Sequence, residues 1–171
     1  MKNQAEHVFI GKYETTCILR IEGRLTQRSL RNTNAAVQQC LENATLTNAL
    51  LDITQCSYMD STILGIIAHW AITFTETHSA LPFLVGLEGS PLENIFRRMN
   101  LTTLFHVCDN TDIVQNSTLA HLSFSEEHYS TAEYAHHVLS AHETLAQLSP
   151  ENAREFAAVI RYLQAEIDQQ T

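Results

Sequence analysis

The chain has 171 residues, 44% of them hydrophobic, so it has the size and composition of one globular domain with its own core. The net charge of −9, with ten Lys and Arg residues that form no run, argues against nucleic acid as a partner, because phosphate contacts need clustered cations. We recognise no secretory signal and no membrane-spanning stretch, and the four cysteines form no CxxC pair, so we expect no membrane insertion and a cytoplasmic location.

The first part of the chain predicts two strands and a helix. The stretch from Val8 to Tyr13 suits a short edge strand, and Thr16 to Glu22 alternates in the way a strand does. A turn between the two would make them an antiparallel hairpin. Apolar residues at helical spacing then predict a helix from Ser29 to Glu42.

The middle of the chain predicts a buried strand, a short turn and a helix. The apolar run within Asn48 to Thr54 is typical of a central strand that is covered on both faces. The helix begins at Asp60-Ser61. An apolar stripe follows it at intervals of four, three and four residues, through Ile63, Ile67, Trp70 and Phe74.

Further elements are predicted before residue 120. Pro82 to Leu87 is a short buried strand, and Ser90-Pro91 begins a helix, with Ser as N-cap and Pro at the first helical position. Leu104 to Cys108 is a last strand, and a helix capped at residue 109 or 110 runs toward residue 119. Strands that alternate with helices predict an α/β fold with a small, mainly parallel sheet packed by helices.

The composition changes near residue 120. Residues 1–120 hold 11 acidic and 8 basic side chains, a net charge of −3, whereas residues 121–171 hold 8 and 2, a net charge of −6. We therefore expect a first domain over 1–120, a polar linker over 121–129 and an α-helical hairpin over 130–171. Two helices make a small core, so the hairpin should pack on the first domain or on another chain, for example as a homodimer.

The hairpin prediction rests on a helix-start motif and on two apolar seams. Ser130-Thr131-Ala132-Glu133 matches a capping box, in which a hydroxyl and a carboxylate satisfy the amides of a helix start. The seams run from Tyr134 to Leu148 and from Phe156 to Ile167, at alternating spacings of three and four residues.

Ser61 is the residue on which the functional question depends. From spacing alone, Asp60 or Ser61 caps the helix, or Ser61 is a phosphorylation site, where the helix dipole favours a phosphate and Asp60 repels it. Gly65 lies one turn on, on the same face, and its missing side chain would leave that face open to a partner. A hydrolase nucleophile is disfavoured, because Met59 and Ile63 stand where a nucleophile elbow needs glycines.

Other chemistry finds no support in the spacing. The nine histidines include no pair at i and i+4 in the C-terminal part, so we expect no metal site, and the five isolated glycines form no phosphate-binding loop. We expect no cofactor, no catalytic residues and no enzymatic activity. The adjacent pair Arg97-Arg98 is interpreted as part of a solvated helix face.

The chain resembles the STAS domain family of bacterial anti-sigma factor antagonists and related regulators, over roughly residues 8–120. Three blocks in the family's order carry the resemblance: Ile21 to Leu25, Leu51 to Gly65 with Tyr58-Met59-Asp60-Ser61-Thr62 at its centre, and Leu84 to Phe105. The hairpin lies outside them. Two departures concern Thr62-Ile63, where the family commonly has Ser and Gly, and Thr26, where the antagonists commonly have an acidic residue.

The resemblance implies a signalling protein in transcription regulation without a catalytic centre of its own. In the antagonists, an anti-sigma factor that is also a serine kinase phosphorylates a serine at a helix start, and a phosphatase resets it. That position matches Ser61, with Thr62 as a second candidate. The implied partner-binding residues are Thr26, Asp60, Ser61, Thr62 and Gly65. The alternative is an unphosphorylated STAS scaffold or subunit, of the stressosome type or of a lipid-transport complex, that dimerises through the hairpin.

Overall fold

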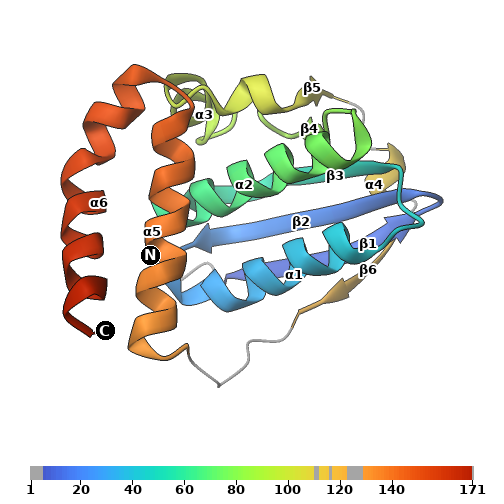
Figure 1. Cartoon of the computed structure of the whole chain (residues 1–171). Helices are drawn as coiled ribbons and strands as arrows, with labels where there is room; N and C mark the ends of the chain where they lie inside the picture. Colours follow the sequence, from blue (N-terminus) through green and yellow to red (C-terminus); the bar gives the residue numbers. More distant parts are fainter. Residues whose placement is uncertain (1–5, 110–111, 116, 123–128, 171) are drawn as a thin grey trace.

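A computed structural model describes residues 6–109, 112–115, 117–122 and 129–170. The described strands form one sheet in the order β5-β4-β3-β2-β1-β6 (Figure 1). Strands β2 to β5 run parallel to one another, and β1 is antiparallel to both of its neighbours. The strands are β1 (His7–Tyr13), β2 (Thr16–Leu25), β3 (Asn48–Met59), β4 (Phe83–Val85), β5 (His106–Cys108) and β6 (Thr118–His121). The predicted α/β fold class is confirmed.

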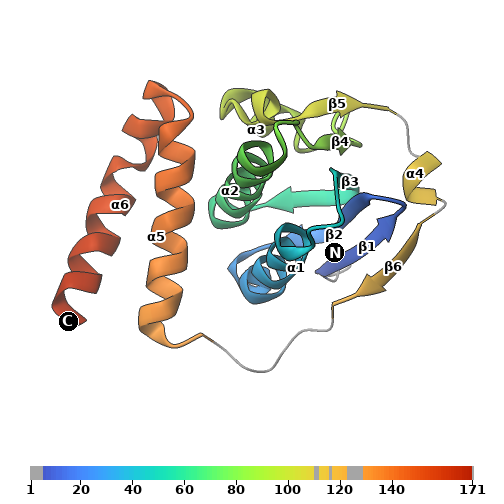
Figure 2. The ribbon, with the colours of Figure 1, turned by 45° about the vertical axis from the view of Figure 1, so that its right-hand side comes forward.

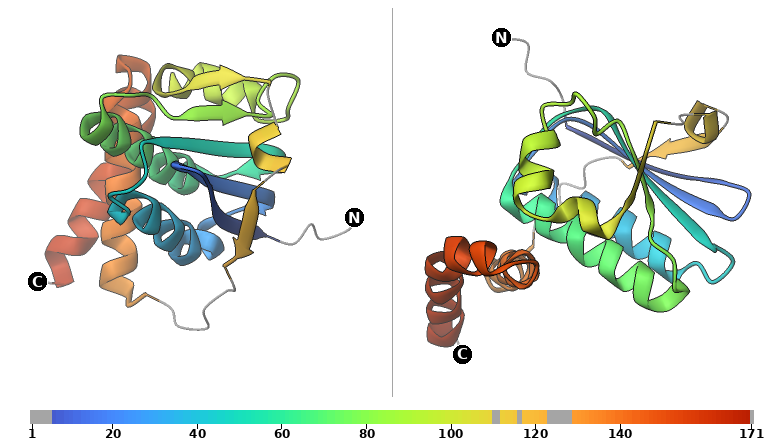
Figure 3. Two further views of the ribbon diagram at one scale, coloured as in Figure 1. Left: turned by 90° about the vertical axis from the view of Figure 1, so that its right-hand side faces the viewer. Right: turned by 90° about the horizontal axis from the view of Figure 1, so that it is seen from above.

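The α-helices lie mainly on one face of this sheet and at one of its ends (Figure 2). The α-helices are α1 (Leu30–Glu42), α2 (Ser61–His78), α3 (Glu93–Arg98), α4 (Asp112–Gln115), α5 (Thr131–Gln147) and α6 (Pro150–Gln170). Two short 3-10 helices are η1 (Gln27–Ser29) and η2 (Leu101–Leu104). Helices α1 and α2 lie side by side against the sheet, and both begin at the end where α5 crosses them (Figures 1 and 3).

The predicted stripe of α2 forms the centre of the main core. Ile63, Ile67, Trp70 and Phe74 are completely shielded from solvent. Every residue from Thr62 to Ala68 is also buried, so solvent is excluded from more than the sheet-facing side of this helix. A one-sided amphipathic helix would leave a polar face exposed. The first turns of α2 are therefore covered by a second element, which is α5.

Three elements differ from the predictions. Strand β3 has no turn after Thr54 but continues to Met59, because β2 pairs with it as far as Leu25. Strand β1 is not an edge strand, because β6 pairs with its outer side. The helix expected toward residue 119 is limited to the four residues of α4, and β6 follows it. Residues 110, 111 and 116 of that stretch lie outside the described part.

The last α/β elements also begin later than predicted. Ser90 and Pro91 form a turn in which the Ser90 hydroxyl accepts a hydrogen bond from the Leu92 amide at 3.2 Å, and α3 begins at Glu93. The predicted strand from Leu104 starts at His106, after η2.

The C-terminal hairpin is present and packs on the sheet domain. Helix α5 lies against α2, and α6 lies on the outer side of α5 (Figure 1). The predicted capping box is formed, since the Ser130 side chain and Glu133 satisfy each other's backbone amides. The two apolar seams meet only in part between the helices, since Ala141, Leu145 and Phe156 belong to the main core. Part of them forms a separate cluster of Ala135, Val138, Leu139, Leu163 and Ile167.

Candidate functional site at the start of helix α2

Asp60 caps α2 and joins two helix starts. Its Oδ1 atom accepts a hydrogen bond from the Ile63 amide at 3.0 Å, and its Oδ2 atom accepts one from the Gln27 amide at 2.7 Å. A carboxylate here also lies at the positive end of the α2 dipole. Of the two predicted caps, Asp60 is the one observed, so Ser61 does not have this role.

The Ser61 hydroxyl is bonded to a histidine of the hairpin. Its Oγ atom lies 2.9 Å from Nε2 of His142, whose Nδ1 atom lies 2.8 Å from the Val138 carbonyl oxygen. A carbonyl only accepts, so Nδ1 carries a proton, and in this tautomer Nε2 accepts the hydrogen bond from Ser61. His142 is buried, and its ring packs edge-on against Phe156 at 5.3 Å. The hairpin therefore engages the hydroxyl that the sequence marks as the phosphorylation candidate.

Gly65 is the point of closest approach between α2 and α5. A Cβ atom placed on Gly65 would lie 2.2 Å from the carbonyl oxygen and 2.7 Å from the Cα atom of Ala141. Since these neighbours are backbone atoms, no side-chain movement could make room for a methyl group. Gly65 thus lets the backbone of α5 rest directly on α2.

The expectation that the face of Ser61 and Gly65 lies open to a partner is wrong, and two of the implied partner-binding residues on α2 are buried. Thr62 is buried with 6% exposure, and Gly65 lies under Ala141. Asp60 and Ser61 are half-buried. The physical reason is the hairpin, which packs on the face that the sequence alone leaves open. Of the two candidate hydroxyls, Ser61 is thus the more accessible.

Thr26 lies on the neighbouring loop and caps η1. Its hydroxyl accepts a hydrogen bond from the Arg28 amide at 3.3 Å and donates one to Glu6 at 3.1 Å. Glu6 also accepts a hydrogen bond from the Ser29 hydroxyl. Through the Gln27 amide, this loop is attached to Asp60. The structure therefore brings Thr26 to the same end of the domain as Asp60 and Ser61.

Tyr134 of α5 contacts the same loop. Its hydroxyl donates a hydrogen bond to the Gln27 side chain. Burial raises the pKa of Tyr134, and the carboxylate of Asp60 raises this pKa further, so the phenol stays protonated and able to donate. The hairpin is thus hydrogen-bonded to the loop before α1 as well as to Ser61.

A groove of about 310 Å³ opens beside Ser61. Its apolar lining comes from α2, α3 and the end of β3 and includes Leu64, Leu92, Ile95 and Met99. Tyr58 also lines it, is 38% exposed and stacks under the Arg24 guanidinium at 4.1 Å. An apolar surface with an exposed aromatic residue is typical of protein–protein contacts.

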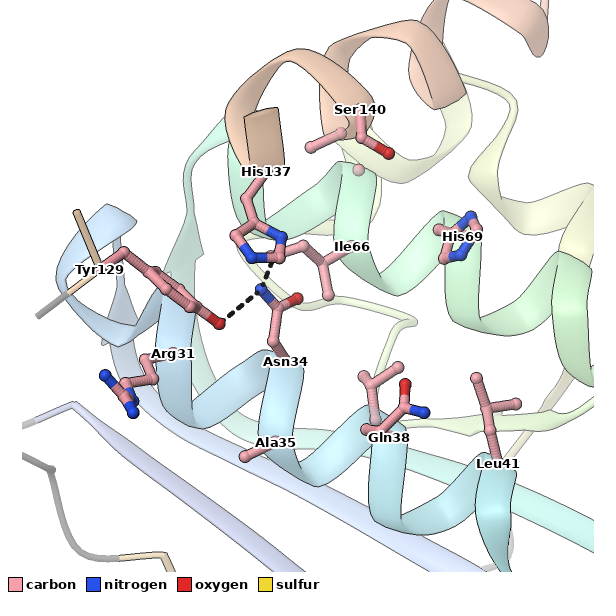
Figure 4. Close-up of a pocket in the computed structure, with 13 residues that line it drawn as sticks. Arg31, Asn34, Ala35, Gln38, Leu41, Ile66, His69, Tyr129, His137 and Ser140 are labelled. Atoms are coloured by element: carbon pink, nitrogen blue, oxygen red, sulfur yellow. Dashed lines mark hydrogen bonds between the residues drawn. The ribbon is translucent and has the colours of Figure 1, made fainter. Parts of the chain in front are cut away.

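A second hollow of about 480 Å³ lies where α1, α2 and α5 meet (Figure 4). Asn34 crosses it and donates hydrogen bonds to the Tyr129 hydroxyl at 3.3 Å and to Nδ1 of His137 at 3.4 Å. The rings of Tyr129 and His137 contact each other with centroids 4.5 Å apart and planes tilted by 38°. Burial lowers the pKa of His137, which keeps its Nδ1 atom able to accept. The hollow shows that α5 covers the surface of α1 and α2 only in part.

Two further features are not found in the part of the chain that the structure describes. Its histidine, cysteine and acidic side chains nowhere gather in a group of three or more that could hold a metal ion. None of its helices combines the length and the apolar character that a membrane crossing needs.

The comparison with protein families decides the relationship. The family model described as "Mlab, STAS domain" matches residues 9–107, which run from β1 to β5 and contain the whole of α1, α2 and α3. The chain belongs to the STAS family. The hairpin of α5 and α6 lies outside the matched region, as the resemblance of the sequence blocks implied.

Two solved structures are similar to this STAS chain at low identity. They are the anti-sigma factor antagonist SpoIIAA in its unphosphorylated form and the Bacillus cell fate determinant SpoIIAA in the phosphorylated form. Each is 16% identical, with TM-scores of 0.48 and 0.49; 63% of this chain aligns with 93% and 96% of those chains. A likeness at this level says nothing about what this chain binds. A search of curated proteins gives no match.

The sequence missed the residues through which the hairpin contacts the STAS domain. The spacing of the C-terminal histidines bears only on a metal site and gives no sign that His142 contacts Ser61. Tyr134 was assigned to the apolar seam. Buried Asn152 also connects the parts, since its Nδ2 atom donates to the carbonyls of Met99 at 3.0 Å and Leu145 at 2.9 Å. One available signal was a polar residue, Asn152, beside the seam that begins at Phe156.

Proposed function

We propose that this protein is a non-enzymatic regulator whose STAS domain binds a protein partner at the start of α2, and that phosphorylation of Ser61 switches this binding. The partner class is an anti-sigma factor that resembles a serine kinase, with a phosphatase that resets the switch. The observation that carries the proposal is the position of Ser61. It is the first residue of α2, it is not the cap, and it borders an apolar groove.

The chemistry of this position supports a switch. A phosphate on Ser61 would be favoured by the positive end of the α2 dipole and repelled by the carboxylate of Asp60. It would also place up to two negative charges at the rim of the groove lined by Leu64 and Met99. A partner that covers the groove would have to desolvate this charge, so the phosphorylated form should bind weakly.

Phosphorylation is tested directly by incubating the protein with ATP and a candidate anti-sigma kinase, and then mapping the modified residue by mass spectrometry. We expect the phosphate on Ser61 rather than on buried Thr62. A protein that takes up no phosphate at either residue would contradict the proposal.

Binding is tested with charge variants of the same helix. Ser61→Asp should weaken binding of the kinase-like partner, and Ser61→Ala should retain it. Thr77→Asp adds the same charge at the exposed far end of α2 and is the matched control. Equal binding of the Ser61→Asp and Ser61→Ala proteins would remove the support for a switch.

The alternative is an unphosphorylated STAS subunit of a larger complex. The hydrogen bond from Ser61 to His142 favours it, because the hydroxyl already has a structural partner within the chain. In that case Ser61 is a contact residue, and its substitution by Ala or Asp affects the hairpin alone. The division at residues 120 and 130, the cytoplasmic location and a homodimer through the hairpin stay predictions.

A further inference from the structure

The hairpin covers part of the start of α2, to which the proposed function assigns a partner. His142 lies on Ser61, the backbone of Ala141 lies on Gly65, and Tyr134 is bonded to the loop that is attached to Asp60. These contacts come from one face of α5 over about two helical turns. A partner approaching Ser61 or Gly65 from this side, or a kinase approaching the hydroxyl, meets α5 first.

The contacts that hold the hairpin on the STAS domain differ from those that hold the hairpin together. Helices α5 and α6 have their own apolar cluster, which includes Val138, Leu139 and Leu163. Their fully buried apolar contribution to the main core is small and consists of Ala141, Leu145 and Phe156. Partly buried apolar residues of the hairpin, among them Tyr134, Leu148 and Ile160, add to this packing. The other contacts are the exposed ion pair of Arg98 with Glu155 and hydrogen bonds of single polar side chains, which water can replace when the surfaces separate.

The fit between the hairpin and the domain is also incomplete. The hollow of about 480 Å³ between α1, α2 and α5 has polar side chains from all three helices at its edge, among them Asn34, His69 and His137 (Figure 4). The face of α1 and α2 therefore extends beyond the area that α5 fills.

We propose that the C-terminal hairpin is a displaceable cover of the Ser61 face, which leaves as a preformed unit before a partner or a kinase reaches α2. The surface beneath it fits an α-helix, with a small residue opposite Gly65 and a hydrogen-bond acceptor opposite Ser61, as α5 provides. The proposal rests on the proposed function for the identity of this face, but its test needs neither a kinase nor a partner.

The test measures how accessible position 61 is in the full chain. A Ser61→Cys reporter is combined with Cys108→Ser, because Cys17, Cys40 and Cys56 are buried and Cys108 is partly exposed. The rate of alkylation by N-ethylmaleimide is measured under native conditions, and mass spectrometry identifies the thiol that has reacted. The three buried thiols report on the folding of the STAS domain in the same sample.

The cover is removed by Gly65→Ala. The added methyl collides with the backbone of Ala141, whereas α2 itself gains a better helix former. Gly89→Ala is the matched control, because a Cβ atom there has nothing within 4 Å, and its backbone φ of 70° strains only a turn away from α5.

We expect Gly65→Ala to raise the alkylation rate of the reporter about tenfold or more, since overpacking of this contact favours the open state. Gly89→Ala should leave the rate unchanged, and the buried thiols should stay unreacted in both proteins. Equal reporter rates in the two variants would overturn the proposal. It would also be overturned if Gly65→Ala exposed the buried thiols together with the reporter, because the hairpin would then be part of the folding core.

The helix-binding part of the proposal is tested by adding a synthetic peptide of residues 131–147 to the Gly65→Ala reporter protein and to the protein with Gly65. The peptide can bind only where the hairpin has left the surface of α2 and where Gly65 still allows the close approach of a helix backbone. In the reporter protein with Gly65, the hairpin is released by Asn152→Ala, and we expect the added peptide to slow the alkylation of Cys at position 61. In the Gly65→Ala reporter protein, we expect the peptide to have no effect on this rate. Identical rates with and without peptide in the Asn152→Ala protein would overturn the fit to a helix.

Discussion

The hydroxyl of Ser61 and the imidazole of His142 are 81 positions apart in the chain and 2.9 Å apart in space. This hydrogen bond connects the residue with the strongest functional signal in the STAS domain to a helix that the STAS family model does not cover. Binding of a partner or phosphorylation at the start of α2 therefore affects the contact between the hairpin and the STAS domain.

The first prediction concerns the strength of the Ser61–His142 contact. His142→Ala should lower the free energy of unfolding by about 1–3 kcal/mol, because it removes a hydrogen bond and buried packing against Phe156. A double-mutant cycle with Ser61→Ala, measured by urea denaturation, should give a coupling of about 0.5–1.5 kcal/mol. The exposed His136→Ala is the control and should show no coupling to Ser61. Additive effects for His142 would contradict a direct interaction.

The second prediction concerns Asn152, the buried amide at the apex of the hairpin. Asn152→Ala leaves the Met99 and Leu145 carbonyls without its hydrogen bonds and should cost about 1–3 kcal/mol. Hydrogen exchange should then speed up in α5 and α6 more than in the sheet. Gln164→Ala, which removes only an exposed bond to Asp168, should change neither quantity. A uniform increase of exchange across the sheet would show that Asn152 stabilises the whole chain instead.

The third prediction is a pH dependence of hairpin docking. Burial lowers the pKa of His137 in the folded protein, so the neutral ring is favoured, and Asn34 donates to its unprotonated Nδ1 atom. The associated stability is fully present above the unfolded pKa near 6.5, and it decreases as the pH falls through that value toward the lower folded pKa. The carboxylate of Glu133, whose pKa is lowered by its bonds to Ser130, adds a loss of stability only below about pH 4.5.

This dependence is measured as the alkylation rate of the position-61 reporter and the thermal midpoint at pH 7.5 and pH 5.5. Each rate is divided by the alkylation rate of a fully exposed reference thiol at the same pH, which corrects for the change in the thiolate fraction. His137→Gln should flatten the profile, and His106→Gln, at an exposed position of β5, should leave it unchanged. The same slope in both variants would assign the effect to a different group.

The fourth prediction concerns the homodimer. The outer face of α6 carries Tyr162 at 67% exposure, the highest value among the exposed large hydrophobic residues of the described part of the chain. A dimer through the hairpin would bury this ring, so Tyr162→Arg should halve the solution mass measured by sedimentation. Arg161→Ala at the neighbouring exposed position is the control. A mass that is the same for Tyr162→Arg and the unchanged chain contradicts dimerisation through this face.

Local patterns in the sequence predict most of the fold. The stripe of α2, the capping box at Ser130 and the two seams of the hairpin depend on residues a few positions apart, and each is observed. The elements that were wrong depend on distant partners. The continuation of β3 to Met59 depends on pairing with β2, and β6 exists as a strand because β1 offers it an edge. No local periodicity contains that information.

The candidate site shows the same division. Asp60 as a cap and Ser61 as the first helical residue follow from the chain around them. The burial of Thr62 and Gly65 does not, because it is caused by a helix more than seventy residues away that has its own regular pattern. An apolar seam fixes which helices pair with each other. The surface on which the helix pair docks depends on single contacts, such as the one at Gly65. Periodicity in the sequence does not predict such contacts.

The buried amide of Asn152 has a mechanical consequence. Its hydrogen bond attaches the hairpin apex to Met99 at the end of α3. A hairpin that leaves the STAS domain while this bond persists would rotate about the apex. Tyr134 lies about 12 Å farther along α5 from the apex than His142 does. In such a rotation the contact of Tyr134 with the loop before α1 would open farthest, and the contact of His142 with Ser61, closer to the apex, would open least.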